Sequence, residues 1–158
     1  RMFTRVSLIA SFVLVFAFSV FSQEAPATNF DAEMAKKAGA DDYGMRSYVF
    51  CILKTGPRDA KIKDKKQRDE IFAGHMANIK RLAGEGKLAG AGSFGKNTRK
   101  YRGIFVFAVP TVEEAQKLVE TDPVIKSGMM VAELTPWYGS AAMMFVNEQH
   151  SKVQKKSF

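Results

Sequence analysis

Two stretches of the chain are apolar without interruption and rich in strand-forming residues. The first covers residues 47–53, apart from its initial serine, and Gly56 and Pro57 stop it. The second covers residues 104–109, and Pro110 ends it. Such runs are typical of strands that are buried on both faces of a sheet. Shorter apolar segments at residues 88–91 and 129–134 predict two more strands, and residues 141–146 predict an additional edge strand.

A helix is predicted between the first and second strands. Apolar positions within residues 71–82 recur at a spacing of three and four, and two glycines follow this segment. This periodicity is typical of a helix that packs one face on a core, with the glycines as its C-terminal stop. His75 shares the apolar stripe, so we expect its side chain on the inward-facing edge of the helix.

A second helix is predicted after the third strand, where Thr111 and Glu114 form a capping box. Asp122 stands directly before Pro123, and the proline ring disfavours helical backbone at the residue that precedes it. We therefore expect the Asp122 carboxylate at the end of a helix and not along its side. Gly128 is expected to end the turn that follows.

The predicted order β, α, β, β, α, β is that of the ferredoxin-like split βαβ fold, a member of the α+β class. The first and third strands are central in this fold, in agreement with their continuous apolar character. Two helices cover only one face of such a sheet, so the other face, carrying Phe105 and Phe107 or their neighbours, requires a partner surface. We therefore predict a homodimer that packs sheet to sheet and encloses hollows in which reactive groups meet.

The N-terminal residues predict a secretory signal. Residues 6–21 carry no charge, they follow a short basic start, and a polar segment begins after Ser22. We interpret residues 1–22 as a cleaved signal peptide, which predicts an exported protein, periplasmic or extracellular, that contacts the membrane only through this segment before cleavage. The alternative is an uncleaved anchor, although the apolar run is shorter than the roughly 18 to 20 residues of a spanning helix.

The length of 158 residues suits one globular domain. Residues 23–44 contain few large apolar side chains and predict a flexible linker, residues 45–147 form the predicted domain, and residues 148–158 form a basic C-terminal tail.

The charge of the chain is positive, and its cysteine and histidine content is low. Lys and Arg number 24 against 16 Asp and Glu, which gives a formal net charge of +8. A single cysteine, Cys51, excludes an internal disulfide and a Cys-based zinc cluster, and its apolar neighbours assign it to the core. Two histidines leave little for a His-rich metal site, so we expect no metal.

Two nucleotide-binding patterns occur in unsuitable contexts. Gly90, Gly92 and Gly95 spell GxGxxG, but a helix precedes them where dinucleotide binding requires a strand, so no cofactor is expected. RNA-recognition domains share the predicted element order, and Arg102 with Gly103 begins a pattern similar to theirs. The aromatic residue required directly after the glycine is absent, so no nucleic acid is expected as a partner.

Four segments resemble the YCII-related domain family: YVFCILKTGP at residues 48–57, HMANIKRLAGEGKLAGAGSF at 75–94, RGIFVF at 102–107 and TVEEAQKLVETDPVIKSG at 111–128. The resemblance covers roughly residues 45–134. It implies a dimeric α+β barrel of ferredoxin-like subunits and a pocket in which His75 and Asp122 pair as a catalytic dyad. The chain departs from the family pattern at Ser93, where a proline is usual, on the rim of the implied pocket.

Two functions of different classes follow from this resemblance. In the first, the protein is a small enzyme in which Asp122 orients His75, and His75 acts as general acid and base in elimination or hydrolysis on a small organic molecule. Ser93, Arg102, Trp137 and Tyr138 are then expected to line the pocket. In the second, the protein is a non-catalytic dimeric module that binds a small ligand or another protein in the same pocket.

Overall fold

The structure is a computed structural model that describes residues 29–156. Of the described residues, 31–156 belong to one compact unit. The predicted signal peptide, residues 1–22, lies outside the described residues. Within residues 29–156 every helix is too short or too polar to span a membrane.

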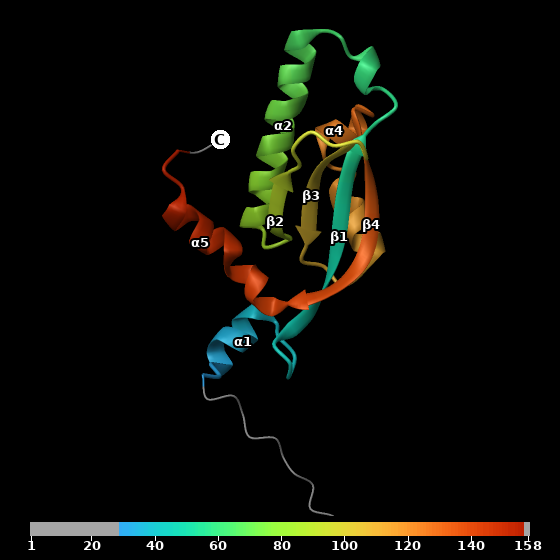
Figure 1. Ribbon diagram of the computed structural model, residues 1–158. Coiled ribbons are helices and arrows are strands. Elements are labelled where there is room, and N and C mark those ends of the chain that lie inside the picture. The colour runs from blue at the N-terminus through green and yellow to red at the C-terminus, as the bar shows by residue number, and fades with distance from the viewer. Residues whose placement is uncertain (1–28, 157–158) are drawn as a thin grey trace, which may run out of the picture. The chain divides into compact units, whose positions relative to one another are not determined.

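The four strands, with α2 and α3 between them, follow the predicted order β, α, β, β, α, β (Figure 1). The elements, in chain order, are α1 (Ala32–Ala38), β1 (Met45–Thr55), the 3₁₀ helix η1 (Asp59–Lys61), α2 (Lys65–Gly84), β2 (Leu88–Ser93), β3 (Tyr101–Phe107), α3 (Val112–Val119), α4 (Pro123–Lys126), β4 (Met130–Ser140), the 3₁₀ helix η2 (Ala141–Phe145) and α5 (Val146–Val153). The strands form one antiparallel sheet in the order β2–β3–β1–β4. The predicted ferredoxin-like α+β fold, with the first and third strands at the centre, is therefore confirmed.

The helices begin and end where local sequence signals place them. Asp64 caps α2 by accepting from the Lys66 amide at 3.0 Å, and Thr111 caps α3 by accepting from the Glu114 amide at 3.2 Å. Beyond α2 the chain turns at Gly86, whose φ of 67° lies in the left-handed region that glycine tolerates without strain. These caps fix the length of α2 and therefore the position of the residues that it carries into the core.

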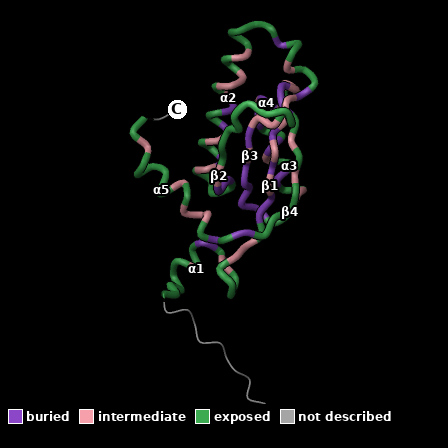
Figure 2. Tube along the Cα trace, in the orientation of Figure 1, coloured by how far each residue is buried: buried purple, intermediate pink, exposed green. Residues whose placement is uncertain are grey.

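Helices cover one face of the sheet, which we call the helix face. On this face Val49, Cys51 and Leu53 of β1 and Phe105 and Phe107 of β3 pack against apolar residues of α2, α3 and α4. In the view of Figure 1, β1 and β4 partly hide α3 and α4, and α2 lies to the left along β2. Figure 2 shows that the buried residues concentrate along β1 and β3, in agreement with their predicted central position.

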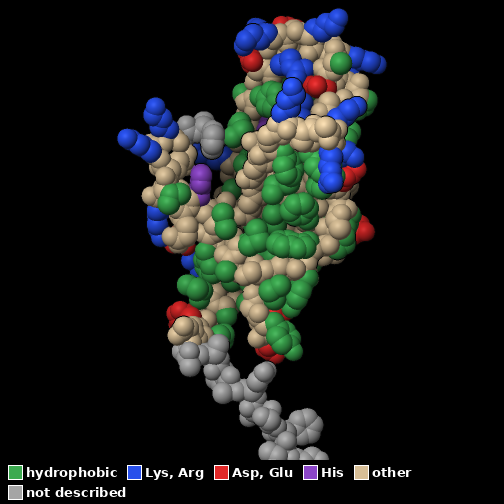
Figure 3. All heavy atoms as spheres, in the orientation of Figure 1, with side chains coloured by type: hydrophobic (Ala, Val, Ile, Leu, Met, Phe, Trp, Pro, Cys, Tyr) green, Lys and Arg blue, Asp and Glu red, His purple; other side chains and the backbone are tan. Residues whose placement is uncertain are grey.

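The opposite face of the sheet, which we call the open face, has no layer of helices over it. Strand alternation places on it five partly exposed apolar side chains, Phe50, Ile52, Ile104, Val131 and Trp137, together with the Lys54–Glu133 ion pair at 2.6 Å. The sequence predicted that Phe105 and Phe107 or their neighbours would lie on this face. Phe105 and Phe107 lie on the helix face, and their neighbours lie on the open face. Only one end of the open face is covered, by two methionines of η2. Figure 3 shows the resulting apolar surface, in green, across the middle of the sheet.

The segment after β4 differs from the prediction. Residues 141–146 were expected to form an edge strand, but residues 141–145 form the 3₁₀ helix η2, so this expectation was wrong. The Ser140 hydroxyl accepts from the Ala142 amide at 3.3 Å and starts this helix. The turn lets two adjacent methionines, Met143 and Met144, both pack against the sheet, which a strand with alternating side chains does not allow.

Two further helices lie in segments for which the sequence predicts a linker and a tail. Helix α1 begins at Asp31, which accepts from the Met34 amide at 2.9 Å, and its last residue, Ala38, is buried. Helix α5 takes up the start of the predicted tail, and Asn147 donates to the Leu88 carbonyl of edge strand β2 at 2.7 Å. Regular structure therefore extends beyond both predicted domain boundaries, because tertiary contacts stabilise these short helices.

Candidate active site

His75 is carried into the core by α2. It lies on the same side of the helix as Ile71, Asn78 and Leu82, and the residue is only 9% exposed. Phe105 of β3 contacts the imidazole with ring centroids 5.8 Å apart, and Phe72 contacts it edge-on at 6.2 Å. The imidazole therefore contacts two phenyl rings on the helix face, as its place in the apolar stripe predicts.

Asp122 reaches the same place from the junction of α3 and α4. It is the N-cap of α4 and its side chain is fully buried, with the Val124 amide donating to Oδ1 at 3.1 Å. Pro123 occupies the first turn of α4, where its missing N–H costs no hydrogen bond. The expectation of a carboxylate at a helix end is thus confirmed, and the helix N-terminus adds a favourable interaction with the negative charge.

The structure brings His75 and Asp122 together. Nδ1 of the imidazole lies 2.8 Å from Oδ2 and 3.0 Å from Oδ1 of the carboxylate. An ionised carboxylate only accepts hydrogen bonds, so Nδ1 carries the hydrogen and, in the neutral ring, Nε2 carries the lone pair. No described residue bonds Nε2, and 11% of the side chain remains exposed. The arrangement therefore leaves one basic nitrogen available for proton transfer.

A second layer of polar side chains supports the carboxylate. Asn78, one helical turn after His75, donates to Oδ2 of Asp122 at 3.4 Å, and its own carbonyl oxygen accepts from Arg81 at 2.8 Å. The Thr121 hydroxyl lies 3.1 Å from the same Asn78 oxygen. Asn78 was not among the predicted site residues, although its position three residues after His75 on the same helix face is a signal for it.

Cys51 lies in the core near this pair. Its side chain is fully buried, as predicted from its apolar neighbours. Burial, and to a smaller extent the negative charge of Asp122, raise the pKa of the Cys51 thiol from its ordinary value of 9.0 to about 12. The thiol is therefore protonated and unreactive at neutral pH.

This raised pKa predicts a specific loss of stability at alkaline pH. The folded state holds the thiol proton up to about pH 12, whereas the unfolded chain releases it near 9.0. The contribution to stability is therefore complete below pH 9 and is lost as the pH rises toward 12, with about 1.4 kcal/mol gone at pH 10. Urea unfolding measures the free energy of unfolding at pH 8 and at pH 10. Between these pH values it should fall by about 1.4 kcal/mol less in Cys51→Ala than in the wild type. An identical pH dependence in both proteins would contradict the prediction.

The four predicted pocket residues form their contacts elsewhere. Ser93 is exposed at the end of β2, and Arg102 lies 3.6 Å from Asp59. Trp137 packs on Tyr48 and Phe50 on the open face, and Tyr138 donates to Asp41. Among the described residues, none of the four forms a hydrogen bond, an ion pair or a ring contact with His75 or Asp122. Their role in a pocket stays a prediction.

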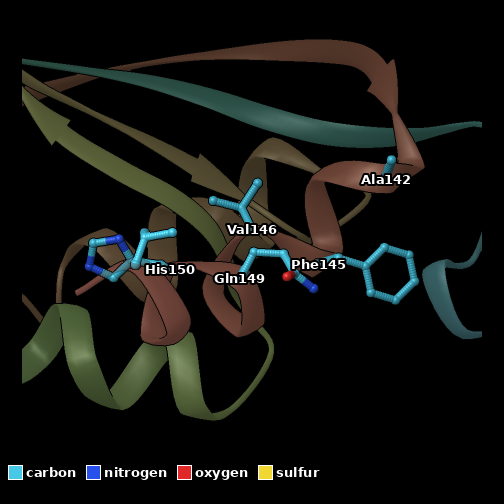
Figure 4. A pocket seen from close by; sticks show the side chains of 6 residues that line it. Ala142, Phe145, Val146, Gln149 and His150 are labelled. Atoms are coloured by element: carbon cyan, nitrogen blue, oxygen red, sulfur yellow. The ribbon is translucent and has the colours of Figure 1, made fainter. Parts of the chain in front are cut away.

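His75 and Asp122 do not lie where the expected dimer would enclose them. A sheet-to-sheet dimer was expected to enclose the reactive groups, but the pair lies between α2 and the sheet, on the face opposite to the open one. A groove does exist in the unit, lined by residues of η2 and α5, and Figure 4 shows His150 in it. This groove includes neither His75 nor Asp122.

In the part of the chain that the structure describes, no cluster of three or more His, Cys, Asp or Glu side chains is placed to hold a metal ion.

The family resemblance found in the sequence is confirmed by a family model. The model of the YCII-related domain matches residues 48–138, which is more than half of the chain. Among solved structures, the chain is similar to the 5-chloro-2-hydroxyhydroquinone dehydrochlorinase of Burkholderia phenoliruptrix AC1100 in complex with 2,5-dihydroxybenzoquinone, with 20% identity and a TM-score of 0.41 over 56% of this chain and 92% of that chain. A search of the curated proteins finds no match. By the match over residues 48–138, the chain belongs to the YCII-related domain family.

Proposed function

We propose that the protein is a small enzyme that acts on a small organic molecule by acid and base chemistry at His75. The observation that carries this proposal is the 2.8 Å contact between Nδ1 of His75 and the buried carboxylate of Asp122. This contact fixes the ring and its tautomer, so that the proton-accepting nitrogen has one defined direction. A histidine that serves only packing needs no such partner, because a backbone carbonyl satisfies it equally well.

The proposed chemistry is elimination or hydrolysis. In elimination, Nε2 takes a proton from carbon, the C–H electrons form the new double bond, and the leaving group departs with its bonding pair. In hydrolysis, Nε2 takes a proton from the attacking water. In both reactions Asp122 stabilises the imidazolium that forms, and the imidazolium returns its proton to the leaving group or to solvent.

Two further features belong to the proposal. The first is export, which rests on the uncharged segment at residues 6–21. The second is assembly into a homodimer through the open face, where partly exposed apolar side chains next to the Lys54–Glu133 ion pair form a surface of the kind that marks an interface.

Substitution of His75 by Gln tests the catalytic proposal. Purified protein is incubated with two sets of small molecules, one with an acidic C–H bond beside a leaving group and one of esters and lactones. The wild type should convert members of at least one set, and His75→Gln should lower the rate by about 10²- to 10⁴-fold, because an amide accepts no proton at neutral pH.

His150→Gln is the matched control, since His150 lies in the groove of η2 and α5, away from Asp122. This variant should retain full activity, and circular dichroism should show that both variants are folded. Equal rates in the wild type and His75→Gln would refute the catalytic role. Binding of a compound without conversion by the wild type would favour the non-catalytic module instead.

A further inference from the structure

Most of the excess positive charge of the chain lies at one end of the domain. Residues 56–70 and 94–102 contain ten Lys and Arg and four Asp and Glu, so these 24 residues carry +6 of the formal net charge of +8. We call these two segments the basic end. Figure 3 shows Lys and Arg side chains, in blue, gathered at the top of the view, where α2 begins.

Contacts inside the domain hold the two segments side by side. Asp59 pairs with Arg68 at the start of α2 at 2.7 Å and lies 3.6 Å from Arg102 of β3. The Thr55 amide of β1 donates to the Lys100 carbonyl at 3.0 Å. The carboxylate of Asp59 is therefore occupied between two arginines and does not neutralise the cations that face outward.

Seven cations of the basic end point into solvent without an acidic partner. Within the described residues these exposed side chains form no ion pair: Arg58, Lys61, Lys63, Lys66, Lys96, Arg99 and Lys100. Segment 94–102 contains no acidic residue at all. A surface of this kind raises the local concentration of anions around it.

The turn between β2 and β3 presents three of these cations from a rigid backbone. The Asn97 side chain donates to the carbonyls of Gly95 and Tyr101 at 2.9 and 2.8 Å and accepts from the Tyr101 amide at 3.1 Å. Lys100 has a φ of 60°, in the left-handed region that favours glycine. Lys100 therefore occupies a position at which glycine would be less strained. This observation favours a functional role for the lysine charge.

An apolar side chain stands beside these cations. Phe94 is 45% exposed, and its ring packs on Tyr101 with centroids 5.7 Å apart. The Arg99 guanidinium lies over the Tyr101 ring, 5.9 Å from its centroid. An exposed aromatic ring among lysines and arginines combines the two features with which proteins bind the headgroup region of an anionic bilayer.

From these observations we infer that the basic end docks on the surface of an anionic lipid bilayer, with the Phe94 ring at the headgroup level. Five of the seven unpaired cations are lysines, which act as mobile point charges and suit a diffuse anionic surface better than bidentate recognition of single phosphates. Nucleic-acid binding favours a row of exposed rings along a groove, whereas here Phe94 is the exposed ring and Tyr101 is half-buried beneath it. The inference does not depend on the catalytic proposal.

Vesicle sedimentation tests the inference. The full chain and the chain from Gln23 are mixed with vesicles of phosphatidylcholine alone or of equal parts phosphatidylglycerol and phosphatidylcholine. The readout is the ratio of binding to the two compositions, which separates the effect of charge from any contribution of the uncharged residues 6–21. The test variant is Lys96→Gln/Arg99→Gln/Lys100→Gly, in which the glycine suits the left-handed backbone. The control is Lys152→Gln/Lys155→Gln/Lys156→Gln, which removes the same charge at the C-terminal end.

We expect the wild type and the control to prefer the anionic vesicles and to lose this preference as salt is raised. The test variant should bind them about a hundredfold more weakly, since each cation near the surface contributes about a fivefold factor. Equal weakening in both triple variants would overturn the inference, because net charge alone would then explain binding. Tighter binding to a single-stranded oligonucleotide than to the vesicles, lost in the test variant, would assign the basic end to nucleic acid and overturn it as well.

Discussion

Replacing Asp122 by Ala is expected to lower the free energy of unfolding by about 3 kcal/mol. Three interactions are lost together, because Asp122 caps α4, accepts from Asn78 and pairs with His75 in the core. Loss of an N-cap alone costs about 1 kcal/mol, and a buried donor left without its partner costs a further 1 to 3 kcal/mol, roughly. Urea unfolding at neutral pH, monitored by circular dichroism, measures the change.

Asp64→Ala provides the matched control for this prediction. Asp64 caps α2 with the same type of bond, to the Lys66 amide at 3.0 Å, but it is exposed and has no histidine partner. The free energy of unfolding of this variant should be lower by about 1 kcal/mol, which is the contribution of an N-cap. Equal losses in Asp64→Ala and Asp122→Ala would show that the contact with His75 contributes nothing to stability.

A double variant separates the contact with His75 from the rest. In His75→Leu/Asp122→Ala no buried imidazole is left without a partner. The decrease in the free energy of unfolding should therefore be smaller, by about 1 kcal/mol or more, than the sum of the decreases in His75→Leu and Asp122→Ala. Strict additivity would mean that the two side chains lie side by side without an energetic coupling. The orienting role proposed for Asp122 requires this coupling.

The sequence was most informative where a local rule determines the result. The uninterrupted apolar runs identified β1 and β3 as the central strands, and Pro123 placed the Asp122 carboxylate at a helix end. Strand β4 was expected to end at Leu134 but continues through Pro136 to Ser140. It is an edge strand, so a proline removes a backbone donor there at little cost.

The meeting of His75 and Asp122, which are 47 positions apart, depends on how α2 packs against α4. That approach is close at Gly74, where an added Cβ would lie 2.8 Å from Cγ of Pro123. A glycine inside a predicted helix, directly before the histidine, was therefore a signal of a tight helix contact at this point. The helices α1 and η2 escaped prediction because they are short and are stabilised by contacts with distant residues.

Replacing Ile52 by Asp is expected to convert the proposed homodimer into folded monomers. Ile52 lies near the centre of the open face, opposite Ile104 on β3 and Glu133 on β4. In the monomer the new carboxylate reaches water from this partly exposed position, so the fold should persist. In a sheet-to-sheet dimer the twofold symmetry buries the new carboxylate twice, in each subunit next to Glu133.

Burial of two unpaired carboxylates costs several kcal/mol, so the dissociation constant should rise by about a thousandfold or more. Val153→Asp is the control, since it adds the same charge at an apolar residue of α5 that is 80% exposed and lies outside the open face. Sedimentation velocity at micromolar concentration should show dimers for the wild type and Val153→Asp and monomers for Ile52→Asp. A wild-type monomer would show that no surface joins the subunits. A dimer in all three proteins would show that another surface joins them, because in a sheet-to-sheet dimer a carboxylate at residue 52 is buried beside Glu133.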